Sequence, residues 1–186
     1  AAWLAAARDA ASPALDANRV MGALGSIAAS RVARELGLGG PSFAISCEEA
    51  SGLRALEVAV DALRAGELSW ALAAAVDLNG DPRTVLATDG LRPWSRRGVA
   101  RALDEAADGP LPGEGAVALV LKRLSDAEAA GDRVYAVIRG VGAASGAAQG
   151  RCTVEAYQQA ARRAYHDAAL APSTVTCIEA HGSGDP

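Results

Sequence analysis

The chain has 186 residues, of which 51% are hydrophobic and 4% aromatic, and its formal net charge is −4. This length and apolar content suffice for one ordinary domain with an aliphatic core, and the acidic balance gives no reason to expect nucleic acid. No apolar run reaches the roughly 18 residues of a membrane span and no signal peptide is predicted, so we expect a cytoplasmic location and no membrane contact. Three widely spaced cysteines predict neither a disulfide framework nor a metal site: Cys47, Cys152 and Cys177.

The N-terminal third is predicted to contain two helices, then a short strand that runs into a third helix. Alanine-rich residues 2–15 favour a short helix, and apolar positions at helical spacing favour a clearer one over residues 19–36. Glycine and proline in residues 37–41 end it. Residues 43–47 predict a short strand, and the helical spacing resumes over residues 53–66. Such a strand-to-helix corner is a common place for a reactive side chain.

The rest of the chain continues the alternation. Apolar runs predict buried strands over residues 70–76 and 115–122, and the intervening residues 79–112, rich in Gly, Pro, Asp and Arg, are expected to be mostly loop. The remaining predicted elements are a brief helix over residues 124–130, a long strand over 133–146, an amphipathic helix over 153–169 and a last strand over 174–180. Strands that alternate with helices indicate an α/β fold with a largely buried sheet.

Five motifs in the chain match one family in their order and spacing. They are LGLGGPSFAISCEEASGLRALEVAVDALRAGE, ALAAAVDLNGDPR, ALDEAADGPLPGEGAVALVLKRLSDA, VYAVIRGVGAASG and IEAHGSGDP. Over residues 17–186 the chain therefore resembles the β-ketoacyl synthases, or ketosynthases, which are the condensing enzymes of fatty acid and polyketide assembly.

The resemblance implies a thiolase-like fold, in which two similar halves stack as α-β-α-β-α layers. We expect the chain to be the central segment of one such domain, with the later part of the first half ending near residue 123 and the start of the second half at about residues 133–186. The resemblance also implies substrates carried on the phosphopantetheine of an acyl carrier protein, with no bound cofactor and no metal. It further implies a dimer with a partner ketosynthase domain or with a second copy of the chain.

The nucleophile of the family is a cysteine at the strand-to-helix corner, where the helix N-terminus lowers the pKa of the thiol. In the family pattern it follows Gly-Pro-Ser after six intervening residues, and that count from Ser42 ends on Glu49. Leu53 and Leu56 continue the pattern without a gap, whereas Cys47 lies two residues too early. We therefore expect Glu49 at the nucleophile position. A carboxylate there is a poor acyl acceptor, because its product would be a reactive anhydride.

The motif SCEEASG and the upstream segment ALGSIAASRVAR resemble chain-length-factor-like domains of polyunsaturated-fatty-acid-type synthases. Those domains pair with a genuine ketosynthase and contribute to the acyl tunnel without supplying the cysteine. Two enzymatic alternatives stay open: condensation with Cys47 as the nucleophile of a shifted corner, or decarboxylation of malonyl groups, with Glu49 where some loading domains have glutamine. A third reading is a small α/β binding module unrelated to synthases.

His181 follows the last predicted strand, and side chains at the carboxyl ends of strands commonly form ligand sites in α/β folds. The resemblance implies that this histidine stabilises the enolate oxygen during decarboxylation, and that a second catalytic histidine follows after residue 186. The resemblance also implies a substrate-binding set of flanking residues, namely Gly113, Glu114, Gly115, Gly182, Ser183 and Gly184.

Simpler structural roles are possible for the residues of the corner. Ser46 and Glu49 fit the S-x-x-E capping box, in which each side chain accepts a hydrogen bond from a backbone N–H group at the start of a helix. Cys47 fits a small, buried packing residue.

Other polar and sulfur-containing residues have simple interpretations as well. We expect Cys152 and Cys177 to be packing residues and His166, in the amphipathic helix, to lie on the surface. The arginine-rich residues 92–98 predict a solvated loop or, alternatively, a contact for the acidic carrier protein or its phosphopantetheine arm.

Overall fold

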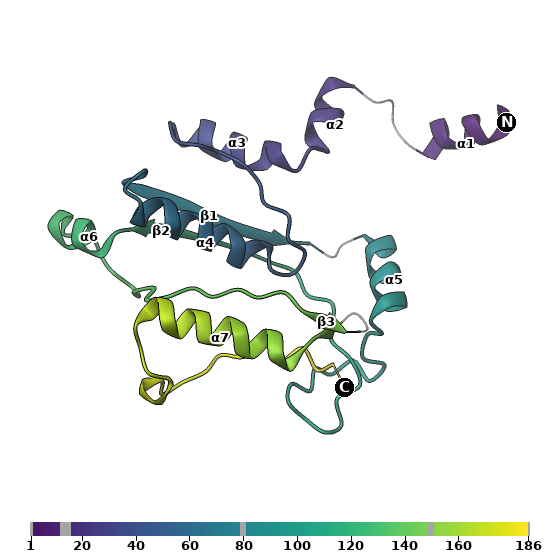
Figure 1. The fold of residues 1–186 in the computed structure, drawn as a ribbon. Coiled ribbons are helices and arrows are strands. Elements are labelled where there is room, and N and C mark those ends of the chain that lie inside the picture. The colour runs from purple at the N-terminus through teal and green to yellow at the C-terminus, as the bar shows by residue number, and fades with distance from the viewer. Residues whose placement is uncertain (1, 12–15, 79–80, 149–150, 186) are drawn as a thin grey trace. The chain divides into compact units, whose positions relative to one another are not determined.

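The computed structural model describes residues 2–11, 16–78, 81–148 and 151–185 (Figure 1). They divide into two units, Ala1–Leu56 and Glu57–Pro186, and the boundary falls inside helix α4 (Ser51–Arg64).

The first unit contains α1 (Ala2–Ala11), α2 (Ala17–Gly22), α3 (Ser26–Glu35) and the first turns of α4. The helix predicted over residues 2–15 is confirmed for its described part, and residues 12–15 lie outside the described residues. The helix predicted over residues 19–36 is interrupted between α2 and α3, where Gly22 and Gly25 flank the break and weaken the helix.

The strand predicted over residues 43–47 is wrong. These residues form irregular structure that ends in an isolated bridge between Cys47 and Glu49. A strand requires a hydrogen-bonded neighbour, and within the first unit the described residues include no other strand to pair with this segment.

The second unit is built around an antiparallel hairpin of β1 (Trp70–Asp77) and β2 (Gly115–Lys122), which confirms both predicted strands. Their register runs from Trp70 opposite Lys122 to Asp77 opposite Gly115. The expected burial of these strands is wrong, because six of the eight residues of β2 are exposed. Strands become fully buried only when both faces of their sheet are covered. In the described residues β1 and β2 pair only with each other, as a two-stranded sheet, and most of β2 remains exposed.

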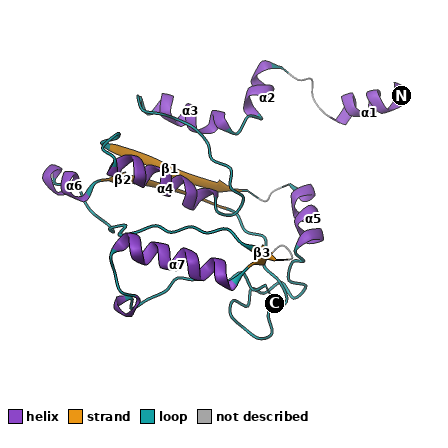
Figure 2. Cartoon of the chain, viewed as in Figure 1, coloured by secondary structure: helices purple, strands orange, loops and turns teal. Residues whose placement is uncertain are grey.

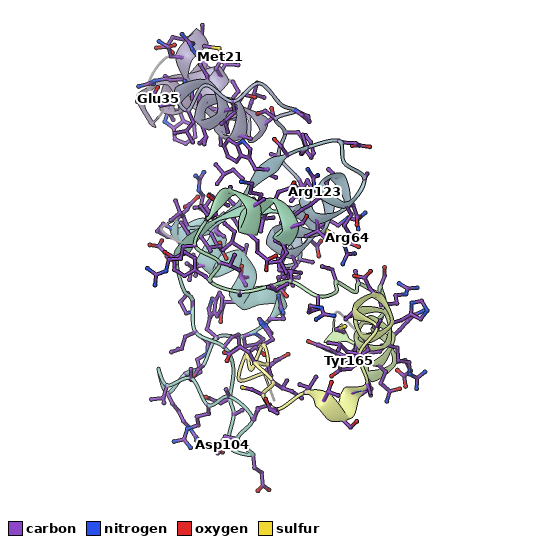
Figure 3. All side chains as sticks on the ribbon, turned by 90° about the vertical axis from the view of Figure 1, so that its left-hand side faces the viewer. Met21, Glu35, Arg64, Asp104, Arg123 and Tyr165 are labelled. Carbon is purple, nitrogen blue, oxygen red and sulfur yellow. The ribbon has the colours of Figure 1, made fainter. Side chains whose placement is uncertain are left out.

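The start of α6 (Leu124–Ala130) is fastened to the end of α4. The Arg123 side chain donates hydrogen bonds to the carbonyl oxygens of Leu63 and Leu68, at 2.8 and 2.7 Å (Figure 3 labels Arg123). It also pairs with Asp126 at 2.6 Å. Leu63 lies in the last turn of α4 and is buried, whereas Leu68 follows the helix, so Arg123 joins the start of α6 to the end of α4 and to the residues just after it.

The prediction that residues 79–112 are mostly loop is confirmed for the described residues, but it missed helix α5 (Pro82–Leu91); residues 79–80 lie outside the described residues. Its start follows known capping rules, because Pro82 occupies the first turn and the Asp81 side chain accepts a hydrogen bond from the Arg83 N–H at 3.0 Å. The Arg83 guanidinium also bonds the Asp81 carboxylate and lowers its pKa.

Two predicted helices of the second unit are confirmed, namely α6 and α7 (Val154–Ala168). The Thr153 hydroxyl accepts a hydrogen bond from the Ala156 N–H at 3.2 Å at the start of α7, and Ala169 ends it in the left-handed conformation. The remaining short elements are β3 (Ala147–Ala148), β4 (Arg151–Cys152) and the 3₁₀ helix η1 (Pro172–Thr174).

The strands predicted over residues 133–146 and 174–180 are wrong. Thr174 ends η1 and the other residues of both segments are irregular, and Figure 2 shows the first segment as a loop that runs beside α7. Gly140 and Gly142 allow this close approach: a Cβ atom on Gly140 would lie 2.5 Å from the Ala164 carbonyl oxygen and 2.6 Å from the Ala168 nitrogen. The segment therefore packs on the alanine-rich side of a helix instead of pairing with a strand.

An ion pair joins the ends of α4 and α7. The Asp167 carboxylate accepts two hydrogen bonds from the Arg64 guanidinium at 2.9 and 3.0 Å, and a third from the Val141 N–H at 2.9 Å. The Val141 N–H and then the Arg64 guanidinium lower the pKa of Asp167. Arg64 also donates to the Arg139 carbonyl oxygen at 3.2 Å, so this pair fixes the start of the segment that crosses α7.

Candidate functional site

The corner before α4 is a tight turn organised by Ser51. The Ser51 hydroxyl accepts a hydrogen bond from the Cys47 N–H at 2.9 Å and donates one to the Glu48 carbonyl oxygen at 2.5 Å. Glu48 has a φ of 48°, in the left-handed region that residues other than glycine seldom adopt. Backbone strain of this kind is concentrated at functional turns, because the surrounding bonds must hold it in place.

The predicted capping box is wrong, because α4 begins at Ser51 and Ser46 lies too far ahead to cap it. Glu49 lies two residues before the helix and is exposed. The positive end of the helix dipole favours a negative charge there. Cys47 is exposed as well, so its interpretation as a buried packing residue is also wrong.

In the second unit, His181 is exposed and directly precedes a turn of two left-handed glycines, Gly182 and Gly184, with φ values of 53° and 75°. The Ser183 hydroxyl accepts a hydrogen bond from the Asp185 N–H at 3.2 Å. Gly184 is buried, and its carbonyl oxygen accepts a hydrogen bond from the Gly109 N–H at 3.0 Å. This bond anchors the turn after His181 to a loop that is distant in sequence.

Residues 92–110 form this loop, the arginine loop, and carboxylate side chains stabilise it by accepting hydrogen bonds from within it. The Asp108 side chain accepts hydrogen bonds from the Ser95 hydroxyl at 2.7 Å and from the Arg96 N–H at 3.2 Å. The Ser95 hydroxyl is the main reason why the pKa of Asp108 is lowered. Because Gly109 packs against the backbone of residues 93–95, a Cβ atom on it would lie 2.5 Å from the Pro93 carbonyl oxygen.

Hydrogen bonds join the start of the arginine loop to α5. The Asp89 carboxylate accepts hydrogen bonds from the Trp94 N–H at 2.9 Å and from the Arg96 guanidinium at 2.8 Å, and both lower its pKa. The Trp94 indole donates to the Val85 carbonyl oxygen at 3.0 Å. The expectation of a solvated loop is therefore correct for the exposed arginines Arg96 and Arg97, whereas Trp94 is half-buried.

The structure groups only some of the predicted site residues. Gly182, Ser183 and Gly184 lie in the turn anchored to the arginine loop, and Gly113 and Glu114 are exposed in the segment between this loop and β2, which begins at Gly115. Cys47 and Glu49 belong to the first unit, whereas His181 belongs to the second. The bracing role of Asp108 was not predicted from the sequence, although the Asp-Gly pair 108–109 is a turn signal.

An open, polar pocket of about 590 Å³ lies between the second half of α4 and α7. Its lining includes the Arg64–Asp167 pair, and Figure 3 labels Arg64 and Tyr165 on these two helices. His166 also lines it and is exposed, which confirms the expected surface position. Cys152 and Cys177 are exposed, so their interpretation as packing residues is wrong.

Two negative observations apply to the described ranges. Within residues 2–11, 16–78, 81–148 and 151–185, no group of His, Cys, Asp and Glu side chains could hold a metal ion. No helix in the same part of the chain is long and apolar enough to cross a membrane.

Comparisons with known proteins agree with this arrangement of motifs. The family model described as "Beta-ketoacyl synthase, N-terminal domain" matches residues 3–127, and the model described as "Beta-ketoacyl synthase, C-terminal domain" matches residues 135–186. The chain is 39% identical over 163 residues to pikromycin polyketide synthase component PikAII of Streptomyces venezuelae. This match covers 86% of the chain and 4% of that protein. It is 42% identical over 166 residues to phthioceranic/hydroxyphthioceranic acid synthase of Mycobacterium tuberculosis, covering 87% of the chain and 8% of that protein.

Solved structures give the same result. The ketosynthase from module 6 of the bacillaene synthase of Bacillus subtilis 168 has a TM-score of 0.81 at 34% identity, covering 86% of this chain and 29% of that one. A beta-ketoacyl synthase from Burkholderia phymatum STM815 has a TM-score of 0.86 at 27% identity, covering 97% of this chain and 46% of that one. The chain thus spans less than half the length of each of these relatives and structures.

Proposed function

The chain belongs to the beta-ketoacyl synthase family, and on this premise we propose that it is a ketosynthase domain that does not itself form an acyl-enzyme. The predicted α/β, thiolase-like fold, present in part, is confirmed by the ketosynthase structures that the chain resembles. We further propose a chain-length-factor-like role in a polyketide or fatty acid synthase. In that role the chain pairs with a cysteine-bearing ketosynthase and shapes the acyl tunnel.

The observation that carries the proposal is the carboxylate at the corner before α4. In acyl transfer a thiolate attacks the thioester carbonyl, the tetrahedral intermediate collapses, and the thiolate of the carrier arm leaves with the electron pair. The same attack by the Glu49 carboxylate would produce a mixed anhydride, which lies uphill of the thioester. Glu49 also lies just before a helix start, where the positive end of the helix dipole favours a negative charge.

The proposal assigns the remaining parts of the reaction to partners. An acyl carrier protein delivers the acyl group on its phosphopantetheine arm, and the partner ketosynthase supplies the thiol. His181, exposed beside an anchored turn, faces the arm and supports the shape of the tunnel mouth. This division explains why a matched family motif can lack sulfur at its central position.

Peptide mapping by mass spectrometry after incubation of the full-length protein with acetyl phosphopantetheine tests the proposal. We expect no acetyl group on Cys47 or Glu49 in the unaltered protein, and a thioester on residue 49 in the Glu49→Cys variant. The matched control is the double variant Glu49→Cys, Cys47→Ala, which should acylate equally. An acetyl group on Cys47 of the unaltered protein would refute the proposal.

A second candidate function is condensation through Cys47, and the exposure of this thiol two residues from the predicted position favours it. It requires that Cys47→Ala abolish condensation. The decarboxylase alternative requires cleavage of the malonyl C–C bond, with the electron pair moving to the thioester oxygen and a proton then added at the α-carbon. Carbon dioxide release that is lost in His181→Ala, without acylation at Cys47, would support that alternative instead.

A further inference from the structure

Arg101 is an unpaired cation in an otherwise braced loop. It is half-buried, and its Nε atom is fully buried without a hydrogen-bond partner among the described residues. Arg96 in the same loop pairs with Asp89 at 2.8 Å. A buried donor that lacks an acceptor is destabilising, and in native proteins it commonly marks the place of a ligand or a water molecule.

The nearby carboxylates bond to other groups. Asp108 accepts hydrogen bonds from Ser95 and the Arg96 N–H, and Asp104 accepts one from the Ala106 N–H at 2.7 Å. The arginine loop therefore contains acidic side chains within a few residues of Arg101, yet in the described residues none forms an ion pair with its guanidinium. This distribution leaves the cation available for an anion from outside the loop.

Arg101 also lies against the turn that follows His181. A Cβ atom on Gly184 would lie 3.4 Å from the Arg101 backbone nitrogen, and one on Gly182 would lie 3.0 Å from the Ala102 Cβ. The backbone of residues 101–102 thus packs directly on the predicted substrate-binding turn. The unpaired cation and the exposed imidazole of His181 belong to the same local structure.

We propose that Arg101 binds an anionic oxygen group of the thioester-bearing arm, either the carboxylate of a malonyl-type acyl group or the phosphate of phosphopantetheine. This assignment rests on the proposed function, because that function brings such an arm to His181. A guanidinium suits the task, since it remains charged and its forked N–H groups match the oxygens of carboxylates and phosphates. The buried Nε then gains the acceptor that the loop does not provide.

Three soluble probes separate the two sources of negative charge. Acetyl pantetheine carries neither anion, malonyl pantetheine carries only the carboxylate, and acetyl phosphopantetheine carries only the phosphate. Binding of each to the full-length protein is measured by calorimetry. We expect Arg101→Ala to weaken at least one anionic probe by about ten- to a hundredfold, as for a lost charge-assisted hydrogen bond, and to leave acetyl pantetheine unchanged.

Arg31→Ala is the matched control, because Arg31 is an exposed arginine in α3, outside the arginine loop, and it should leave all three affinities unchanged. If Arg101→Ala does not fold, Arg101→Lys replaces it; lysine keeps the charge but loses the fork, so the anionic probe should still bind more weakly. The assignment is overturned if neither anionic probe binds the unaltered protein. It is also overturned if Arg101→Ala leaves the affinities for all three probes unchanged or lowers them equally. Acylation of Cys47 overturns the proposed function instead, so the two failures are distinguishable.

Discussion

Replacement of Gly140 by alanine tests whether the segment after α6 really packs against the backbone of α7. The added Cβ would lie 2.5 Å from the Ala164 carbonyl oxygen, 2.6 Å from the Ala168 nitrogen and 2.9 Å from the Ala168 Cβ. Ordinary contacts begin at 3.4 Å, so the segment and the helix must separate by about 0.9 Å. Two of the three contacts are to backbone atoms, which no side-chain rotation can relieve.

We expect this strain to lower the free energy of unfolding by about 1–3 kcal/mol, the usual effect of overpacking. For a domain of this size the melting temperature should fall by roughly 2–4 °C for each kcal/mol. The separation would also lengthen the hydrogen bond from the Val141 N–H to the Asp167 carboxylate, now 2.9 Å, and so loosen the contact between α4 and α7.

Urea denaturation followed by circular dichroism at 222 nm measures the change. Gly90→Ala is the matched control, because Gly90 lies in α5 with no atom within 4 Å of the added Cβ. Alanine is the better helix former, so this control should be neutral or stabilising by up to about 1 kcal/mol. If Gly140→Ala proves as stable as the unaltered protein, the close approach of the segment to α7 is refuted.

Three other predictions concern pH, the core and the corner. The ionised Asp167 carboxylate should contribute stability that is complete above the ordinary aspartate pKa of 3.8 and is lost as the pH falls through the lowered pKa of Asp167 in the folded protein. Asp167→Asn removes this contribution. The melting temperatures of the variant and the unaltered protein should therefore differ at neutral pH and converge in acid. Leu63→Ala should cost about 2–5 kcal/mol in urea denaturation, because Leu63 is only 5% exposed, whereas Leu53→Ala, at a site 69% exposed, should cost less than about 0.5 kcal/mol. Ser51→Ala should speed both hydrogen exchange of the Cys47 amide and alkylation of its thiol, and unchanged rates would contradict the bracing role of the hydroxyl.

Helical periodicity was the most reliable signal in the sequence. It located α4 and α7 because each has a face that is determined by residues three and four positions apart. It missed α5, whose start depends on Pro82 and on the Asp81 side chain, both of which also fit a loop. Proline and aspartate are ambiguous in this way because the same residues begin helices and form turns.

Strands were less predictable, because a strand depends on its neighbours. The apolar runs that became β1 and β2 pair with each other, whereas residues 133–146, which are also rich in Val and Ala, instead pack on α7 through Gly140 and Gly142. For the candidate site, the resemblance to the ketosynthase motifs predicted Glu49 and His181 as site residues. The anchoring of Gly184 to Gly109 and the unpaired state of Arg101 arise from tertiary packing, which no local pattern encodes.

The hydrogen bonds of Arg123 bear on the engineering of hybrid synthases. One guanidinium on the N-terminal side of α6 satisfies the carbonyl groups of Leu63 and Leu68, which are more than fifty positions earlier in the chain. A recombination breakpoint between residues 68 and 123 would take the donor and the acceptors from different parents. Chimeras should therefore exchange residues 63–126 as one cassette, and crossovers placed outside it should give higher yields of folded protein.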